Sequence, residues 1–390
     1  MIPVLWAPVV KLSDLLEGGH VSYGIVQPGA DTSDGVPILR VKDIRDGRIS
    51  TEQPLRVDPA ISARHARTLL VGGELVISLV GTVGEAAVVP KSLAGWNVAR
   101  AVAVVRPQSV SSEWLRLAFA TSAVREQVTA LLNTTVQSTL NLSDLKRIDI
   151  PMPVARDREA IVEVLGALDD KIAANTKLAS TADRLAREIY RSIVRGAGVA
   201  PLSSTARFVN GRAFTKGATG TGRVVVRIAE LNSGISGSTV YNDIVVASEN
   251  VARPGDLLFA WSGSLTLHRW YRDEAIVNQH IFKVIPNVEY PMWLVNQLVL
   301  ERLDEFKSIA ADKATTMGHI QRRHLDEPVR VPSRDLIAAN DVHMDALWNR
   351  ALVAERENLT LAATRDTLLP QLVSGKLRVR DAERIVSEVA

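Results

Sequence analysis

The chain has 390 residues and no cysteine, which excludes disulfides and thiolate metal ligands and argues against structural zinc. Its 46 basic and 43 acidic residues leave a net charge of +3, so any surface for nucleic acid must be a local one. The first residues lack a basic region and contain Pro3 and Pro8, and no apolar run reaches membrane-spanning length. We therefore expect a cytoplasmic protein without a signal peptide.

The first predicted module covers residues 1–154. Short β-branched or alternating runs at 36–41, 74–80, 85–89 and 99–105, separated by Gly and Pro, predict strands. A helical segment at 113–132 follows, then a polar loop at 133–141 and a strand that ends at Pro151. This pattern is typical of an α+β module with an irregular β core.

A long helix is predicted next, within a connecting segment at 155–197. Apolar or small residues alternate in steps of three and four, as in the seam of a coiled coil, and Gly196 and Gly198 end the pattern. About 40 residues at about 1.5 Å each would make a helix of roughly 60 Å. The seam includes Leu165, Leu168, Ile172 and Asn175.

The second predicted module covers residues 198–332, with strands at 224–228, 256–261 and 280–285, a helix at 292–310 and a polar loop at 312–321. A second long helix follows at 333–377, with Ser333 as its N-cap and a kink or local break expected near Pro370. Residues 378–390 form a tail. The second seam includes Leu347, Ala351, Asn358 and Leu361.

The two modules are copies of one another in sequence. The run from Gly73 to Ser78 returns at 255–260, so that Glu74 and Asp256 lie 182 positions apart. Similar offsets relate Asn97 to Asn278 and Trp114 to Trp293. A period of this length is the size of a domain, far longer than a solenoid repeat. The repeat predicts an α+β protein with two modules related by a pseudo-twofold axis and separated by two long antiparallel coiled-coil helices.

No catalytic constellation is evident in the sequence. There is no phosphate-binding loop of the Gly-x-x-x-x-Gly-Lys-Ser/Thr type, no Gly-x-Ser-x-Gly elbow and no histidine spacing that suits a metal. The run Gly217–Gly222 lacks the strand and helix of a dinucleotide site, which favours a flexible surface loop. We expect a protein without catalytic activity and with no cofactor of its own.

Several of these stretches resemble the specificity subunit of type I restriction-modification systems. In the first half the resemblance lies in residues 73–84, 97–107 and 140–153. The central helical region of that family is similar to residues 165–175, and its carboxy-terminal region is similar to residues 368–377. The resemblance covers nearly the whole chain and preserves the order of the parts.

The resemblance implies that each module is a target recognition domain that reads one half of an asymmetric, bipartite site in double-stranded DNA. It also implies that the helices dock two methyltransferase subunits, which modify adenine at N6, and that a restriction or motor subunit joins them. S-adenosylmethionine, ATP and Mg would then be bound by the partner subunits. The alternative is a coiled-coil scaffold or adaptor that binds only proteins.

Base recognition favours Arg on guanine, Asn or Gln on adenine, and Ser or Thr more permissively, and the two polar loops are rich in these types. Arg40 and Lys42 are candidate phosphate contacts of the first module, with Arg227 in the second. For any single loop residue, a solvated surface position is as good an explanation as DNA contact. The candidates in the loops are Thr134, Thr135, Gln137 and Ser138 in the first module and Lys313, Thr315, Thr316, His319, Gln321 and Arg322 in the second.

Three features have more than one interpretation. The glycines from Gly81 to Gly84 fit a tight turn better than a DNA contact. Trp114 and Trp293 favour core positions over base stacking, whereas the pair Trp270 and Tyr271 fits either. Asn175 could fix the register of the coiled coil or face a partner subunit.

Overall fold

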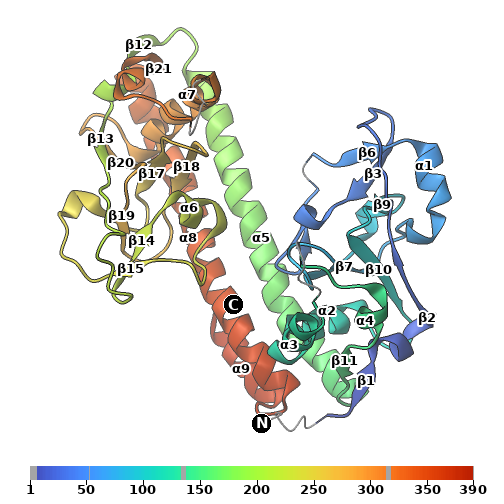
Figure 1. The fold of residues 1–390 in the computed structure, drawn as a ribbon. Coiled ribbons are helices and arrows are strands. Elements are labelled where there is room, and N and C mark those ends of the chain that lie inside the picture. The colour runs from blue at the N-terminus through green and yellow to red at the C-terminus, as the bar shows by residue number, and fades with distance from the viewer. Residues whose placement is uncertain (1–6, 52, 133–137, 313–317, 390) are drawn as a thin grey trace. The chain divides into compact units, whose positions relative to one another are not determined.

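The computed structural model describes residues 7–51, 53–132, 138–312 and 318–389 (Figure 1). The chain divides into two compact units, one of residues 1–169 with 362–390 and the other of residues 170–361. Each unit contains one β-rich module and parts of both long helices.

The first unit is built on an antiparallel sheet with the strand order β2-β10-β7-β8. Val76 and Val104 pair across its centre and are both buried, as the apolar runs of these strands require. The strands are β2 (Leu16–Tyr23), β7 (Leu75–Ser78), β8 (Ala86–Val88) and β10 (Val102–Pro107).

A mixed sheet and two short pairs complete the β structure of the first unit. In the sheet β6-β3-β9, β3 runs parallel to β9 and antiparallel to β6, and the other pairs are β1-β11 and β4-β5. These strands are β1 (Val9–Lys11), β3 (Val36–Leu39), β4 (Ile44–Arg45), β5 (Arg48–Ile49), β6 (Leu55–Val57), β9 (Asn97–Val98) and β11 (Asp149–Pro151). Its shorter helices are α1 (Pro59–Arg64), α2 (Ser112–Ala120), α3 (Ser122–Ala130) and α4 (Leu142–Lys146).

The second unit repeats this topology. Its antiparallel sheet has the order β13-β20-β17-β18, its mixed sheet the order β15-β14-β19-β16, and β12 pairs with β21 (Figure 1). The strands are β12 (Gly198–Pro201), β13 (Ala206–Asn210), β14 (Arg223–Val226), β15 (Tyr241–Asn242), β16 (Val251–Ala252), β17 (Leu257–Ala260), β18 (Thr266–Arg269), β19 (Ala275–Val277), β20 (Ile281–Pro286) and β21 (Pro328–Val331). Its helices outside the long pair are α6 (Ile228–Ser233) and α7 (Met292–Asp312).

Matching hydrogen bonds fix the alignment of the two copies and correct one predicted match. Ala99 donates its backbone N–H to Leu39, and Asn278 donates its own to Val226 in the corresponding place. Asn278 is therefore the counterpart of Ala99, and its match to Asn97 was wrong. Asn97 instead lies buried in β9, where its Oδ1 accepts from Thr68 Oγ1 at 2.7 Å.

A glycine crossing recurs in both copies and shows how closely the backbone is repeated. A Cβ added to Gly24 would lie 1.8 Å from the carbonyl oxygen of Val98, and one added to Gly211 would lie 2.1 Å from that of Asn278. No other residue type allows so close a backbone approach. The crossing brings the start of each module onto the end of its mixed sheet.

The helix predicted at 113–132 is interrupted, whereas its counterpart α7 is continuous. Thr121 has extended backbone angles, and its hydroxyl donates to Ala118 O at 2.6 Å and accepts from Val124 N at 3.4 Å. It therefore ends α2 and caps α3. Trp114 and Trp293 are both buried, as their predicted core role requires, and Trp270 is buried as well.

The two long helices are α5 (Ala155–Ile193) and α8 (Arg334–Val373). Ser333 caps α8 as predicted, because its Oγ accepts from Leu336 N at 3.4 Å. A local break near Pro370 is absent, since α8 includes this residue and ends only at Val373. Having no N–H, Pro370 cannot donate to the carbonyl group four residues earlier, so the helix continues with one hydrogen bond fewer. The predicted tail contains one more helix, α9 (Val379–Val389).

The long helices pack against each other in antiparallel register. In the second unit, four alanines form a shared cluster, so the helix backbones approach closely. In the first unit, Asp169 of α5 pairs with Arg365 of α8 at 2.9 Å. The alanines are Ala179, Ala182, Ala351 and Ala354. The predicted fold class, mixed α and β structure with two long paired helices, is confirmed. None of the helices in the described ranges has the length and apolar character needed to cross a bilayer.

Candidate nucleic-acid interface

Four of the ten predicted loop residues lie in the described part of the chain, namely Ser138, His319, Gln321 and Arg322. The other six lie outside the described residues, and they are Thr134, Thr135, Gln137, Lys313, Thr315 and Thr316. All thirteen candidate contacts to DNA remain predictions. The geometry nevertheless shows what surrounds the seven that are described.

In the first module, the end of the polar loop is held against the glycine turn that follows β7. Gly81 donates its N–H to Ser138 O at 3.3 Å, and Leu140 donates to Leu79 O at 2.9 Å. Gly81 and Gly84 have φ angles of 76° and 87°, which favour glycine and support the turn interpretation. Two segments about 60 residues apart therefore meet at one edge of the sheet.

Arg40 and Lys42 lie beside the same glycine turn. They line a cavity of about 670 Å³ together with Gly81 and Thr82. Arg45 adds a third positive charge, while Asp46 and Glu85 supply negative charge. Lys42 is exposed and available for contact with a phosphate. The remaining lining residues are small or apolar: Val41, Ile44, Val80, Ala99 and Ala101.

Arg40 also has a structural role that the sequence interpretation missed. Its Nε and Nη2 donate to the Asp43 carboxylate at 3.0 and 3.2 Å, and the same carboxylate accepts from its backbone N–H at 2.8 Å. Arg40 Nη2 reaches Gln53 O as well, at 2.9 Å. The side chain is thus bound in a fork geometry that fixes its direction and neutralises part of its charge.

The second module contains the same arrangement in Arg227 and Glu230. Arg227 donates from its backbone N–H and from Nε to Glu230 Oε2, at 2.9 and 3.0 Å. Burial raises the pKa of Glu230, but the hydrogen bonds from Arg227 outweigh it and leave the pKa lowered. The shared pattern Arg-x-x-Asp/Glu could have been found by extending the repeat three residues beyond Arg40 and Arg227.

In the second module the corresponding edge carries aromatic side chains. Gly263 donates to Gly318 O at 2.8 Å, and Ile320 donates to Trp261 O at 3.1 Å, so the loop again returns onto the turn. Trp261 lies between His280 and His319, with ring centroids 5.2 and 6.4 Å away. Gln321 and Arg322 are exposed at the start of a short 3-10 helix that follows.

The predicted seam residues lie between the long helices. Leu165, Leu168, Ala351 and Leu361 are fully buried within the chain, while Ile172 and Leu347 are partly exposed. Asn175 Nδ2 donates to Glu357 Oε2 at 2.8 Å, and Asn358 Nδ2 donates to Thr176 Oγ1 at 3.2 Å. Each asparagine therefore links the two helices. A partner that docks here would meet the outer faces of the helices.

Partly buried ion pairs attach each module to the long helices, around a central acid in the first unit and around a central arginine in the second. In the first unit, Asp169 of α5 binds Arg116 Nη2 at 2.8 Å and Arg365 Nη1 at 2.9 Å. Its backbone oxygen accepts from Arg48 Nη2 at 2.6 Å. Burial lowers the pKa of Arg48, against the opposing attraction of Asp169.

In the second unit, one arginine takes the central place. Arg269 of β18, only 8% exposed, donates two hydrogen bonds to Glu355 at 2.9 and 3.0 Å and two to Asp183 at 3.2 Å. Its guanidinium lies 4.5 Å from the ring centroid of Trp348. Burial raises the pKa of Glu355, and the nearby Asp183 carboxylate adds to this effect, while the hydrogen bonds and charge of Arg269 oppose it.

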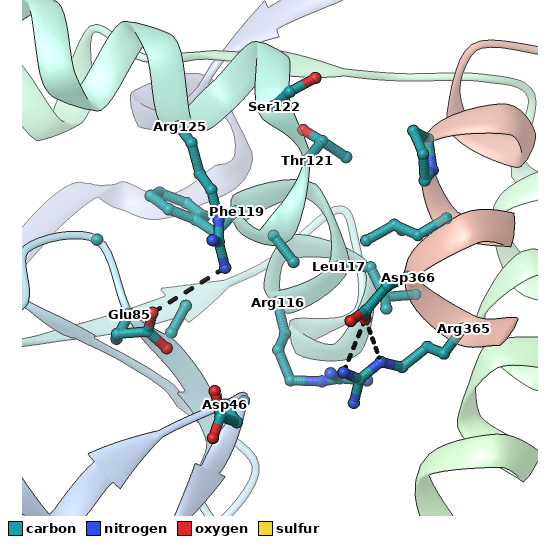
Figure 2. Close-up of a pocket in the computed structure, with 16 residues that line it drawn as sticks. Asp46, Glu85, Arg116, Leu117, Phe119, Thr121, Ser122, Arg125, Arg365 and Asp366 are labelled. Atoms are coloured by element: carbon teal, nitrogen blue, oxygen red, sulfur yellow. Dashed lines mark hydrogen bonds and ion pairs between the residues drawn. The ribbon is translucent and has the colours of Figure 1, made fainter. Parts of the chain in front are cut away.

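A second cavity of the first unit, of about 450 Å³, is lined by Arg116 and Arg365, the two arginines that pair with Asp169 (Figure 2). Figure 2 shows Arg365 paired with Asp366 and Arg125 directed at Glu85, the latter pair at 4.0 Å. Acidic and basic side chains thus balance one another along its wall, and Thr121 serves as a helix cap. Within the described ranges, no group of three or more acidic or histidine side chains could hold a metal ion.

Each of the two copies thus combines an α+β module with a polar loop that returns to one edge of its sheet. Residues 8–182 match the family model of the type I restriction modification DNA specificity domain. The resemblance inferred from the sequence is thus confirmed for this part of the chain.

Relatives and solved structures agree with this assignment. The type I restriction enzyme EcoBI specificity subunit of Escherichia coli is 27% identical over 203 residues, which is 50% of this chain and 42% of that protein. The chain thus matches less than half of this relative's length. The crystal structure of a type I restriction-modification S subunit from M. genitalium aligns with a TM-score of 0.57 and 13% identity, over 95% of this chain and 96% of that one. At this identity the likeness concerns the fold.

Proposed function

We propose that the chain is the DNA sequence-specificity subunit of a type I restriction-modification complex. Each module would read one half of an asymmetric, bipartite site in double-stranded DNA. The observation that carries the proposal is the repeated sheet edge, where a polar loop returns onto a turn in both modules while the side chains around it differ. Two different surfaces on one duplicated scaffold suit two different half-sites, whereas identical surfaces would suit a palindrome.

The long helices would dock two methyltransferase subunits that modify adenine at N6, and restriction or motor subunits would join that complex. Apolar residues on the outer faces support docking: Val342 and Val353, three turns apart on α8, are 78% and 53% exposed. S-adenosylmethionine would be bound by the methyltransferase subunits, and ATP and Mg by the motor subunits. The chain itself would perform no catalysis, and the complex would act in the cytoplasm.

The decisive experiment is a genome-wide map of N6-methyladenine in cells that express the matching methyltransferase subunit, with and without this chain. A split, asymmetric methylation motif that appears only with the chain supports the proposal. Unchanged methylation would refute it and favour the protein-only adaptor. As a control for docking, Val342→Glu combined with Val353→Glu should abolish both complex formation and the motif, while the chain remains folded.

A further inference from the structure

The second module carries an aromatic cluster at a place where the first module has small or aliphatic residues. Leu79 donates its backbone N–H to Ala101 O at 2.8 Å, and Trp261 donates to His280 O at 3.1 Å in the corresponding register. The isolated bridge between Val80 and Thr139 likewise corresponds to that between Ser262 and His319. Trp261, His280 and His319 thus replace Leu79, Ala101 and Thr139.

The cluster is ordered and partly open to solvent. Trp261 stacks on Phe282 with ring centroids 5.7 Å apart, and its Nε1 donates to Asn210 Oδ1 at 2.9 Å. Phe282 is buried and supports one side of the indole. His319 is exposed and meets the indole edge-on, and His280 is partly exposed. The indole is therefore held in one position with two imidazoles beside it.

The backbone beside the cluster is strained at His280. His280 has φ of 72°, in the left-handed region that non-glycine residues rarely occupy. Among the residues that the structure describes, its buried Nδ1 has no hydrogen-bond partner, and neither does the buried Oδ1 of Asn278. Unpaired polar atoms and strained backbone cost stability and concentrate at functional sites. In the first module the same stretch is Ala99-Arg100-Ala101.

The chemistry of the cluster suits base edges better than phosphates. The three side chains offer aromatic surface, which contacts the thymine methyl group, and the two histidine rings carry N–H groups of the kind that donates to purine N7 and O6. None of the three carries the fixed positive charge of Lys or Arg that phosphate contacts usually use. The cluster also adjoins the end of the polar loop, at Gly318 and Ile320.

We infer that Trp261, His280 and His319 contact base edges and determine the half-site read by the second module, in a way that has no counterpart in the first. The inference rests on the proposed function and deepens it. It assigns specificity to three positions that lie far apart in the sequence, of which only His319 belongs to a polar loop.

The test uses the complex of the chain with its methyltransferase subunit and a duplex library with both half-sites randomised. Three single variants introduce the residues of the first module: Trp261→Leu, His280→Ala and His319→Thr. His20→Thr, an exposed histidine of the first module, is the matched control. We expect discrimination to fall about 10-fold to 100-fold at one or more positions of one half-site. The other half-site should stay unchanged, and the control should match the wild type.

Three outcomes would overturn the inference. A half-site unchanged within about 3-fold in all three variants would do so, because a good contact to a base edge contributes more than that. Loss of discrimination in both half-sites would mean that the cluster acts through the fold. If the wild-type complex selects no sequence at all, the proposed function fails first, which is a distinguishable result. His319→Thr, at an exposed position, and Trp261→Phe, which keeps the stacking on Phe282, exclude misfolding as an explanation when thermal unfolding is unchanged.

Discussion

The two modules share a backbone and differ where that backbone meets the polar loop. In the first module, Ala99 and Ala101 leave a cavity of about 670 Å³ beside Arg40 and Lys42. In the second, Asn278 and His280 occupy the corresponding positions, and Trp261 covers the same edge. The scaffold has been kept by the hydrogen bonds of its backbone, while the side chains at this edge have been free to change. The two copies thus share their backbone structure and differ in the side chains at this edge.

The largest expected effect concerns the ion pairs that attach the modules to the helices. Arg269→Leu removes four hydrogen bonds and leaves the partly buried Glu355 without its cation, so it should lower the free energy of unfolding by about 3 kcal/mol. Arg365→Leu should cost less, about 1–2 kcal/mol, because Asp169 keeps Arg116. Urea unfolding followed by circular dichroism measures both. Equal losses of unfolding free energy in the two variants would contradict the expected difference between the Arg269 and Asp169 clusters.

The next effect should be the same in both modules. Asp43→Asn and Glu230→Gln each remove the charge that binds an arginine fork, and each should cost about 1.5–3 kcal/mol in unfolding free energy. Glu249→Gln is the control, because its pair with Arg207 is exposed and should contribute less than about 1 kcal/mol. A large effect in one module alone would show that the shared pattern has different roles.

The second module should contribute a dependence of unfolding stability on pH that the first module lacks at the same position. Burial lowers the pKa of His268, which lies in β18 where the first module has Ala87. The neutral imidazole is favoured in the folded chain, so its contribution is present above the unfolded pKa of about 6.5 and is lost as the pH falls through the lower folded value. His268→Gln should therefore make unfolding stability less sensitive to acid between about pH 7 and pH 5. An unchanged pH profile would show that the group does not contribute.

The smallest expected effect is on DNA affinity. Lys42→Ala removes one exposed charge of the first module and should weaken binding about equally for all sequences. The slope of log K against log salt should fall by about 1 in magnitude. Fluorescence anisotropy with the assembled complex at several salt concentrations measures this. A change in sequence preference would instead make Lys42 a base contact.

Much of the fold could be predicted from the sequence, because the repeat and the seams are periodic patterns. The match of Asn97 to Asn278 was wrong because identical residues drew the alignment two positions away from the hydrogen-bonded register. The interruption at Thr121 was missed because the threonine both ends α2 and caps α3 without a Gly or Pro signal.

The site was harder to predict than the fold. Trp261, His280 and His319 come together only through the pairing of β17 with β20 and through the returning loop, which no local pattern reveals. The fork of Arg40 with Asp43 was not predicted, because it depends on the backbone turn between them. Candidate residues on loops could be named by type, but their surroundings required the structure.

The asparagines between the long helices constrain how this architecture can change in evolution. Asn175 of α5 donates to Glu357 of α8, and Asn358 of α8 donates to Thr176 of α5. The alanines beside them would pack almost equally well if one helix shifted along the other. An insertion in α5 alone would separate both amides from their partners and leave polar groups buried without hydrogen bonds. Insertions and deletions should therefore be inherited in matched pairs, one in each helix, so that lengths of α5 and α8 covary among homologues.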